Sequence, residues 1–318
     1  MISTFGPMRV IVNPKAGRGM VMKSWPAARR VLDQSGIDYR PTLTEGPGHA
    51  MEAARAAVEQ GERFVVAVGG DGTVSEVVNG LMEAAGEPGE GAVLGVVAAG
   101  SGCDFARTFD LPADAAGAAA RLLDDRLWGT LDVGRVSFTA TDGTARSRWF
   151  VNIAEVGLGA DSLRTAIRLP RWLGPAVYRL AAAREIARHR PWQAVIELRG
   201  LAAAGNHPRE LVLDGPLSIL VVANCRYFGG GLMVAPEAGP GDGLFDVQVA
   251  VATRPEALRL MQKMATGSHV PSDRIKEFRA ASITLDGPVS MAVEADGESL
   301  GVTPATFEVV PGALRLKV

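Results

Sequence analysis

The feature that most constrains the fold is an apolar, β-branched run at residues 64–68 that ends in a Gly-Gly-Asp-Gly-Thr turn at residues 69–73. After this turn, apolar side chains recur at intervals of three and four residues as far as residue 81, which predicts a helix with one apolar face. A strand that enters a helix through glycines presents bare backbone N–H groups and the positive end of the helix. The sequence therefore predicts a binding turn for a polyphosphate.

An acidic residue inside this turn sharpens the prediction. The carboxylate of Asp71 repels a phosphate group unless a cation lies between them. The turn therefore indicates a site for a Mg²⁺-nucleotide. The alternative is an ordinary turn between a strand and a helix, with Asp71 as a capping residue, because glycine-rich turns are common.

Two more segments repeat this pattern. Residues 92–99 form an apolar run that leads into Gly100-Ser101-Gly102-Cys103-Asp104, and residues 8–12 lead into a loop that begins at Asn13 and contains glycines. In a parallel sheet, three such loops lie along one edge, and ligands of open α/β sheets bind outside the carboxyl ends of the strands. Together they predict a nucleotide site at that edge.

The organisation of the chain changes near Asp132. Before it, strands alternate with helical stretches at residues 24–35, 50–59 and 113–124, which predicts a parallel sheet. After it, most segments are short, β-branched or aromatic, and separated by Gly, Pro and Asp, which predicts an antiparallel, sandwich-like domain. Helical insertions are expected at about residues 163–189 and 255–266. The expected domains are residues 1–133 and 134–305.

Composition excludes several classes of protein. The chain has 318 residues, 47% of them hydrophobic, and a formal net charge of -2. This length allows two domains with proper cores, and the near-neutral charge gives no indication of nucleic-acid binding. Two cysteines imply no disulfide framework, and we expect neither a signal peptide nor a transmembrane segment. We expect a cytoplasmic protein.

Several motifs occur in the order of a known family. They are Asn13-Pro14 with Gly17, residues 69–73 with Glu76 and Asn79, Gly100-Ser101 with residues 104–107, residues 131–134, residues 229–231 with Ala235-Pro236, residues 242–247, and residues 296–298. With these motifs the chain resembles the diacylglycerol kinase catalytic-domain family, which includes bacterial soluble lipid kinases and the sphingosine and ceramide kinases. The first glycine motif is shared with NAD kinases and phosphofructokinase-like enzymes, whereas the later motifs favour the lipid-kinase branch.

The resemblance implies a fold and a set of binding residues. The first domain would be an NAD-kinase-like or phosphofructokinase-like α/β domain that binds ATP, the second a β-sandwich domain for the lipid acceptor, and the tail at about residues 306–318 would pack back on the first domain. The nucleotide-binding positions carried over are Asn13, Pro14, Lys15, Gly17, Thr44, Gly69, Gly70, Asp71, Gly72, Thr73, Glu76, Gly100 and Ser101.

Acidic residues would supply the catalytic chemistry. Phosphoryl transfer depends on positioning and electrostatics, with one base for the attacking hydroxyl. The resemblance implies that Asp71, Asp104 and Asp132, each expected just beyond a strand, form a Mg²⁺ network. It also implies that Asp296 is the base, next to Glu298. The alternative for Asp296-Gly297 is a simple hairpin turn.

A second ion is implied in the loop at residues 239–244. Asp242 and the backbone carbonyls of Gly239 and Leu244 would bind a structural Mg²⁺ or Ca²⁺. A plain Asp-Gly turn is the alternative.

Two positions depart from the family pattern. Cys103 stands where Asn usually precedes Asp-Phe-Ala-Arg, and Ser75 stands where Asn commonly follows the Gly-Asp-Gly-Thr turn. An Asn side chain both donates and accepts hydrogen bonds, whereas a thiol is a weak donor. The substitutions could slow catalysis, although every carboxylate is retained.

One segment has the composition of a membrane contact. Residues 164–190 contain seven arginines against the single acid Glu185, and apolar side chains including Trp172 accompany them. An amphipathic, basic segment suits an anionic lipid surface, so we expect transient membrane association. The alternative is a solvated helix whose apolar stripe faces the core.

The sequence thus predicts an ATP- and Mg²⁺-dependent kinase that acts on a hydroxyl of diacylglycerol or of a related lipid, which could be sphingoid, ceramide-like or phosphatidylglycerol-like. A homodimer is a possible assembly. The alternatives are an NAD-kinase-like phosphotransferase with a non-lipid acceptor and a nucleotide-binding module that has lost catalysis.

Overall fold

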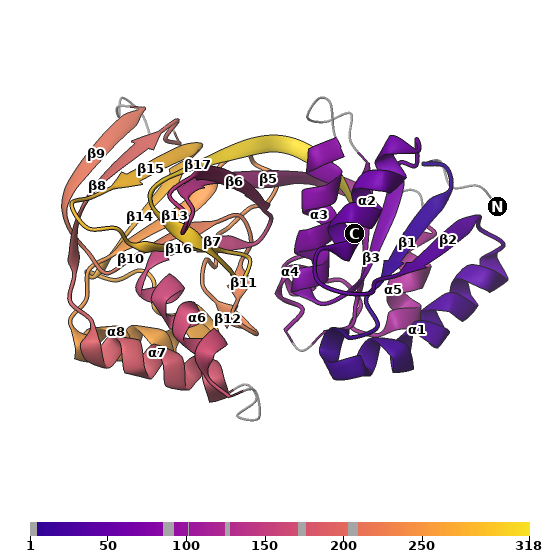
Figure 1. Ribbon diagram of the computed structural model, residues 1–318, viewed down its shortest axis with the longest axis horizontal. Coiled ribbons are helices and arrows are strands. Elements are labelled where there is room, and N and C mark those ends of the chain that lie inside the picture. The colour runs from indigo at the N-terminus through magenta and orange to yellow at the C-terminus, as the bar shows by residue number, and fades with distance from the viewer. Residues whose placement is uncertain (1–4, 85–91, 101, 125–127, 171–175, 203–208) are drawn as a thin grey trace. The chain divides into compact units, whose positions relative to one another are not determined.

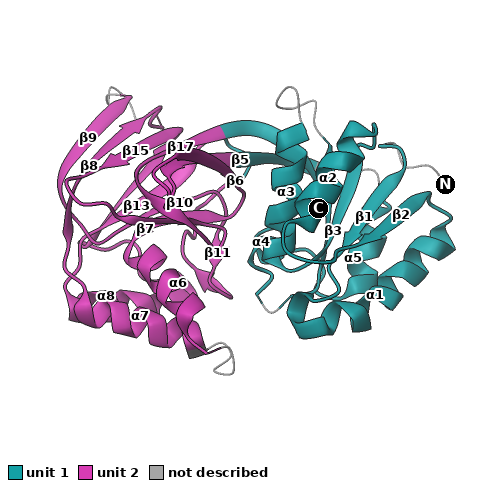
Figure 2. Cartoon of the chain, viewed as in Figure 1, with its two compact units in different colours: residues 1–133, 240–242, 310–318 teal, residues 134–239, 243–309 magenta. Residues whose placement is uncertain are grey.

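The computed structural model describes residues 5–84, 92–100, 102–124, 128–170, 176–202 and 209–318 (Figure 1). The chain divides into two compact units (Figure 2). Unit 1 comprises Met1–Val133, Pro240–Asp242 and Val310–Val318, and unit 2 comprises Gly134–Gly239 and Gly243–Val309. The sequence did not predict that residues 240–242 belong to unit 1.

Unit 1 is a parallel sheet with helices on both faces (Figure 1). The strand order is β17-β4-β3-β1-β2, and each neighbouring pair is parallel. The strands are β1 (Met8–Val12), β2 (Tyr39–Leu43), β3 (Phe64–Gly69), β4 (Val93–Ala98) and the end of β17 (Glu298–Lys317). All six residues of β3 are buried, because a parallel sheet covered on both faces needs apolar side chains on both.

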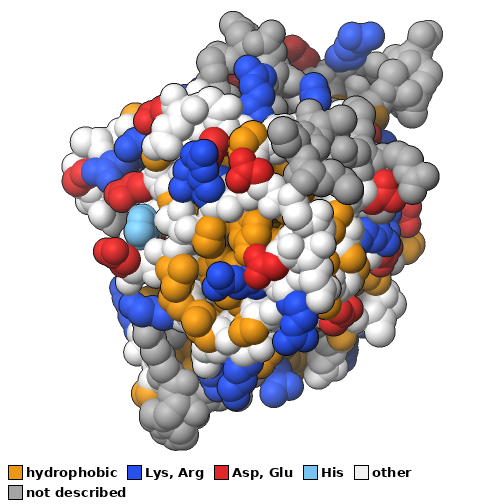
Figure 3. Space-filling view, turned by 90° about the vertical axis from the view of Figure 1, so that its right-hand side faces the viewer, with side chains coloured by type: hydrophobic (Ala, Val, Ile, Leu, Met, Phe, Trp, Pro, Cys, Tyr) orange, Lys and Arg blue, Asp and Glu red, His pale blue; other side chains and the backbone are white. Residues whose placement is uncertain are grey.

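Among the described residues of unit 1, five segments are helical. They are α1 (Ala16–Ser35), α2 (His49–Glu59), α3 (Asp71–Ala84), α4 (Asp104–Thr108) and α5 (Ala115–Leu122). Helices α1 and α5 share an apolar core with one face of β1, β3 and β4, whereas α2 and α3 pack together on the other face. In the face drawn in Figure 3, acidic and basic side chains are interspersed around an apolar area.

Unit 2 is built from antiparallel strands. One run of strands has the order β14-β13-β10-β7-β16-β17, while β15 pairs with both β17 and β8, β8 with β9, and β5 with β6. The strands are β5 (Trp128–Thr139), β6 (Ala145–Phe150), β7 (Ile153–Gly157), β8 (Trp192–Arg199), β9 (Glu210–Leu217), β10 (Ile219–Ala223), β13 (Phe245–Ala250), β14 (Ile275–Ala280), β15 (Ser282–Asp286) and β16 (Ala292–Ala295). A short hairpin, β11 (Tyr227–Phe228) and β12 (Leu232–Met233), stands apart.

The inward faces of these strands form one apolar core, to which Phe150, Phe245 and Phe307 contribute. The rings of Phe150 and Phe245 are stacked with their centroids 5.5 Å apart. A parallel α/β unit followed by a β-sandwich-like unit confirms the predicted fold class.

Helices cover one side of unit 2 (Figure 1). They are α6 (Leu158–Arg168), α7 (Ala176–Arg188), α8 (Arg254–Lys263) and the short 3₁₀ helix η2 (Met264–Thr266). The helical insertion predicted at about residues 163–189 consists of two helices, because α6 ends before Leu169-Pro170 and α7 is a separate helix. Arg171, Trp172 and Leu173 of the predicted membrane segment lie outside the described residues. Within the described part of the chain, no helix is both long enough and apolar enough to cross a bilayer.

Candidate active site

The loops that follow β1, β3 and β4 are tied to one another by hydrogen bonds. The side-chain amide of Asn13 donates to Thr73 Oγ1 at 3.0 Å, and its backbone N–H donates to the Val68 carbonyl at 2.9 Å. The backbone N–H of Ala99 donates to the Gly69 carbonyl at 2.8 Å. The three strand-to-glycine transitions of the sequence therefore meet at one edge of the unit 1 sheet.

Three glycines of these loops are required by close packing. A Cβ atom on Gly100 would lie 2.7 Å from Gly70 Cα, and a Cβ atom on Gly17 would lie 3.0 Å from the Ala99 carbonyl oxygen. A Cβ atom on Gly69 would collide with Thr73 Oγ1. The absence of side chains lets the loops approach each other and leaves their backbone accessible to a ligand.

Two carboxylates stand at helix N-termini in this region. Asp71 is the first residue of α3 and Asp104 is the first residue of α4. Asp71 Oδ1 accepts a hydrogen bond from the Phe105 N–H at 3.0 Å, which links the two helix starts. Both acids therefore lie at the positive end of a helix.

Cys103 occupies a strained position between them. Its φ angle of 54° lies in the left-handed region, which Asn adopts more readily than most residues. Its Sγ accepts the Gly100 N–H at 3.2 Å. Burial raises the pKa of this thiol, and the charges of Asp71 and Asp104 act in the same direction, so the thiol is neutral at neutral pH. The other departure, Ser75, is buried in α3, and its carbonyl accepts the Asn79 side-chain amide at 2.9 Å.

Glu76 supports a neighbouring helix. Its two carboxylate oxygens accept the backbone N–H groups of Gly48 and Ala50, at 3.0 and 3.1 Å, and so satisfy the start of α2. Lys15 Nζ donates to the Glu45 carbonyl at 3.0 Å, and Thr44 is buried with its N–H bonded to the Val12 carbonyl. These predicted nucleotide-binding residues therefore anchor the loops after β1 and β2.

Asp132 lies inside a strand, whereas the sequence predicted a position just beyond one. Strand β5 begins at Trp128, before Asp132. Asp132 is 1% exposed, and its Oδ1 accepts the Gly312 N–H at 2.7 Å while its own N–H donates to the Pro240 carbonyl at 2.8 Å. This residue joins residues 240–242 and 310–318 to the rest of unit 1.

In unit 2, the carboxylate of Asp296 is held by backbone donors. Asp296 follows β16 with a φ of 49°; Oδ2 accepts the Val151 N–H at 3.0 Å and Oδ1 accepts the Asn152 N–H at 2.9 Å. Its own N–H donates to the Ile153 carbonyl at 3.0 Å. Burial raises the pKa of Asp296 to about 6, although these backbone N–H groups act in the opposite direction. The carboxyl group is therefore ionised at neutral pH and fixed in orientation.

The residues that support Asp296 were missed from the sequence. Arg148 forms an ion pair with Glu298 at 2.9 Å. The side-chain amide of Asn224 donates to the Val151 carbonyl, and its backbone N–H donates to the Asn152 carbonyl, each at 2.9 Å. No motif marks Arg148 or Asn224, because their partners are distant in the sequence.

Other predicted positions remain outside these two groups. Ser101 lies outside the described residues, and Asp242 is exposed. Among the described residues, no three His, Cys, Asp or Glu side chains form a cluster that could hold a metal by themselves. Mg²⁺ commonly uses one or two carboxylates together with substrate phosphates and water, so the paired helix starts of Asp71 and Asp104 fit such an ion.

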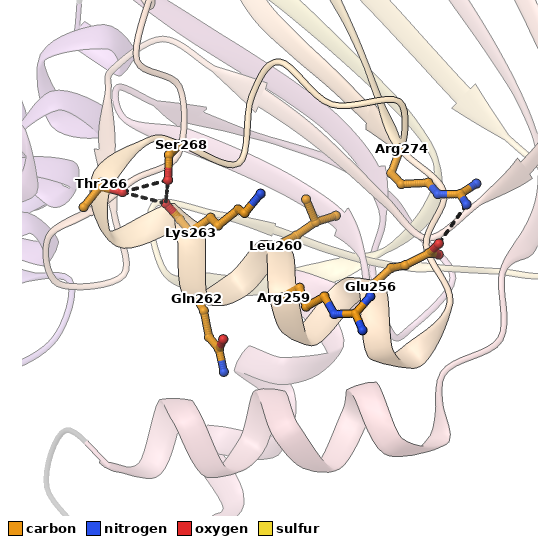
Figure 4. Close-up of a pocket in the computed structure, with 8 residues that line it drawn as sticks. All are labelled: Glu256, Arg259, Leu260, Gln262, Lys263, Thr266, Ser268 and Arg274. Carbon is orange, nitrogen blue, oxygen red and sulfur yellow. Dashed lines mark hydrogen bonds and ion pairs between the residues drawn. The ribbon is translucent and has the colours of Figure 1, made fainter.

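A separate pocket of about 420 Å³ lies along α8 in unit 2 (Figure 4). Its lining is largely basic and polar: Glu256, Arg259, Leu260, Gln262, Lys263, Thr266, Ser268 and Arg274. Arg274 pairs with Glu256 at 2.8 Å. None of the sequence-predicted site residues lines it.

Comparison with known proteins agrees with this geometry. The sequence matches the family "Diacylglycerol kinase catalytic domain" over residues 7–136 and the family "YegS C-terminal NAD kinase beta sandwich-like domain" over residues 152–318. A diacylglycerol kinase of Mycobacterium tuberculosis is 32% identical over 98% of this chain and 94% of its own length.

The chain belongs to the diacylglycerol kinase catalytic-domain family. A diacylglycerol kinase of Bacillus subtilis is 27% identical over 94% of this chain and 92% of its own length. The solved structure of a diacylglycerol kinase from Bacillus anthracis has the same fold, with a TM-score of 0.70, 20% identity, and coverage of 99% of this chain and 97% of that one.

Family membership confirms two predictions from the sequence. The resemblance itself is confirmed, and the chain is a phosphotransferase of a family that uses an alcohol group as acceptor. Use of ATP follows from membership in this kinase family.

Proposed function

We propose that this chain is an ATP- and Mg²⁺-dependent lipid kinase that transfers the γ-phosphoryl group to a hydroxyl of diacylglycerol or of a related lipid. The observation that carries the proposal is the convergence of three glycine loops around two carboxylates at helix N-termini, in a chain that belongs to a diacylglycerol kinase family. Such an arrangement supplies backbone donors for phosphates and acidic ligands for a cation.

The nucleotide phosphates would lie over the loops after β1, β3 and β4. In this proposal Asn13 and Thr73 keep two loops together through their hydrogen bond, and Gly17, Gly70 and Gly100 leave the backbone open to the phosphates. Ser101 belongs to the same motif and is proposed as a further contact.

Asp71 and Asp104 would hold the Mg²⁺, and Asp132, whose carboxylate already accepts a backbone N–H, would reach it only through water. A bound Mg²⁺ would neutralise charge on the phosphoryl oxygens. A second, structural Mg²⁺ or Ca²⁺ at Gly239, Asp242 and Leu244 stays a proposal from the family resemblance.

Asp296 is proposed as the base. Its carboxylate is ionised above about pH 6 and held by two N–H donors, so one lone pair has a fixed direction in which to accept the proton of the acceptor hydroxyl. Glu298, fixed by Arg148, is proposed as a neighbouring polar contact for the acceptor.

The helices α6 and α7 are proposed as the lipid-facing surface. They expose Ile167, Tyr178 and Leu180 together with Arg168 and Arg179. Apolar side chains rimmed by arginines suit an anionic bilayer, where each basic residue contributes about 1 kcal/mol.

An acceptor screen with labelled ATP tests the proposal. Vesicles that contain diacylglycerol, ceramide, a sphingoid base or phosphatidylglycerol would be compared with NAD in solution, in the presence of Mg²⁺. Label transferred to a lipid, and dependent on Asp71, supports the proposal. Phosphorylation of NAD would instead identify an NAD-kinase-like enzyme. ATP binding without turnover on any acceptor would identify a nucleotide-binding module.

A further inference from the structure

Two buried glutamates of unit 2 face each other across neighbouring strands. Glu155 on β7 and Glu294 on β16 are direct partners in an antiparallel ladder. Glu294 is 1% exposed and Glu155 is 7% exposed. Directly opposed residues of an antiparallel pair have Cβ atoms about 4.5–5.5 Å apart, and like charges there are destabilising. Two ionised carboxylates at these positions would repel each other strongly.

Both side chains lie on the face of the sheet that turns away from the sandwich core. Their neighbours Ala154, Val156, Val293 and Ala295 belong to that core, and side chains alternate between the two faces of a strand. Helix α6 follows β7 directly and packs against β7 and β16. A Cβ atom on Gly159 would collide with Glu155 Oε2, so the Glu155 carboxyl group lies against the first turn of α6, where a negative charge is favoured.

Glu294 lacks this compensation. Within the described part of the chain, neither of its carboxylate oxygens accepts a hydrogen bond of ordinary geometry, and an ionised carboxylate is strongly disfavoured in such a place. Burial raises the pKa of Glu294 well above its usual value, and the charges of Glu155 and Asp296 add to this effect, whereas the N–H of Gly297 opposes it. Burial also raises the pKa of Glu155, to about 7.

Other charged groups lie on the elements around the pair. On α6, burial raises the pKa of Asp161, an effect that the Arg164 charge opposes and the Glu185 charge reinforces. On β10, the residue opposite Glu155 is the apolar Val221.

In the turn after β16, Asp296 accepts backbone N–H groups, and on β17 Glu298 is paired with Arg148. No ion pair to Glu155 or Glu294 is present among the described residues. A proton is thus the simplest group that can neutralise the pair.

We propose that Glu155 and Glu294 hold one proton between them at neutral pH, and that Glu294, its main carrier, is a positioning residue for Asp296. The second part rests on the proposed function of Asp296 as the base. The ladder that pairs residues 293–295 with 154–156 leads straight into the turn of Asp296, whose N–H bonds the Ile153 carbonyl. Loss of the shared proton to solvent places two charges across this ladder and pushes β16 from β7, which loosens the hydrogen bonds that hold the Asp296 carboxylate.

The first experiment measures stability against pH and needs no turnover. The free energy of unfolding would be followed from pH 5.5 to 9 for the wild type, Glu294→Gln and, as a matched control, Glu210→Gln at an exposed position of β9. A carboxyl group whose pKa is raised on folding contributes stability at low pH that is lost as the pH rises through the raised pKa. We expect the free energy of unfolding of the wild type and of Glu210→Gln to fall toward pH 9, and that of Glu294→Gln to fall less. The difference between the pH slopes should correspond to about one bound proton per molecule.

An unchanged pH dependence in Glu294→Gln would overturn the shared proton. Stabilisation of the wild type, but not of Glu294→Gln, by added Mg²⁺ or Ca²⁺ would overturn it too, because a bound cation would then neutralise the pair. If Glu294→Gln does not fold, Glu155→Gln makes the same test from the other strand.

The second experiment measures kcat against pH on lipid vesicles. We expect the wild-type kcat to fall on the alkaline side as the proton is lost, and this decline to move to higher pH in Glu294→Gln with the KM for ATP unchanged. The same alkaline decline in both proteins would refute the positioning role. A wild type that phosphorylates no lipid at any pH would refute the proposed function, while the stability measurement would still decide whether the proton is shared.

Discussion

The two units stabilise buried and half-buried acidic side chains in different ways. In unit 1, Asp71 and Asp104 begin helices, and Glu76 accepts two N–H groups at the start of α2. In unit 2, Glu155 and Glu294 oppose each other with no cationic partner among the described residues. Backbone N–H groups are fixed and do not titrate, whereas a shared proton is lost as pH rises. The alkaline pH dependence proposed above would therefore arise in unit 2.

The largest effect is expected from Asp71→Asn. Asn keeps an oxygen that can accept the Phe105 N–H, so the helix starts stay linked while the charge that would face the Mg²⁺-nucleotide is lost. We expect kcat to fall by about 10³–10⁵-fold, the scale of losing an electrostatic group in phosphoryl transfer, with an unchanged thermal midpoint.

Asp114→Asn is the matched control, because Asp114 caps α5 away from the glycine loops by accepting the Gly117 N–H at 2.7 Å. Lipid phosphorylation rates and thermal melts of both variants would show whether Asp71→Asn loses activity without losing stability. Wild-type turnover in Asp71→Asn would show that the Asp71 charge has no role in phosphoryl transfer.

Asp296→Ala tests the contribution of unit 2. We expect kcat to fall by about 10²–10⁴-fold, the range for a positioned base, with little change in the KM for ATP. Because the pKa of Asp296 is raised to about 6, wild-type kcat should also decline below pH 6 as the base becomes protonated.

Steady-state kinetics with both substrates varied would measure these effects, with Asp286→Ala at the exposed last residue of β15 as the control. An unchanged kcat would show that Asp296 is not the base and that Asp296-Gly297 is only a structural turn. A large loss of ATP affinity with kcat retained would place Asp296 beside the nucleotide.

Gly100→Ala tests whether the loops of unit 1 need their close approach. The new Cβ atom would lie 2.7 Å from Gly70 Cα, and because both are backbone positions the loops must separate. We expect stability to fall by about 1–3 kcal/mol, as for other overpacked sites, and the KM for ATP to rise more than kcat falls. Gly129→Ala, where a Cβ atom meets nothing within 4 Å, is the control. Equal ATP affinity in both variants would show that the nucleotide does not depend on this contact.

These effects also separate what the sequence could predict from what it could not. The strand, glycine turn and helix at residues 64–81 are local patterns, so the parallel sheet, its loops and Asp71 were accessible from sequence. Glu76 carries a family motif, but its partners Gly48 and Ala50 lie 28 and 26 residues away, and its role at the start of α2 appears only in the fold.

Contacts between residues that lie far apart in the sequence could not be predicted. Gly312 is 180 residues from Asp132, and the N–H groups that orient Asp296 are 144 and 145 residues from it. The spacing of apolar residues along the chain gives no indication of such contacts. Glu155, in contrast, left a visible sign, since it is a single charge within the otherwise apolar strand at residues 153–157. That charge was a reason to expect an unusual environment.

The smallest effect is expected from Cys103→Asn, which restores the residue usual in the family. Cys103 has a φ of 54°, and Asn tolerates the left-handed region better than Cys does. An amide oxygen is also a better acceptor for the Gly100 N–H than the thiol, whose Sγ lies 3.2 Å from that nitrogen. We expect kcat to be unchanged or to rise by at most about fivefold, since one improved hydrogen bond is worth about 1 kcal/mol.

Cys103→Ala, which removes the acceptor and adds none, should be slower than the wild type, so kinetics and melts of the two variants distinguish a hydrogen-bonding role from a purely steric one. A marked loss of kcat in Cys103→Asn, with activity retained in Cys103→Ala, would show that the loop after β4 has adapted to a small side chain, and that unit 1 has its own departure from the family arrangement.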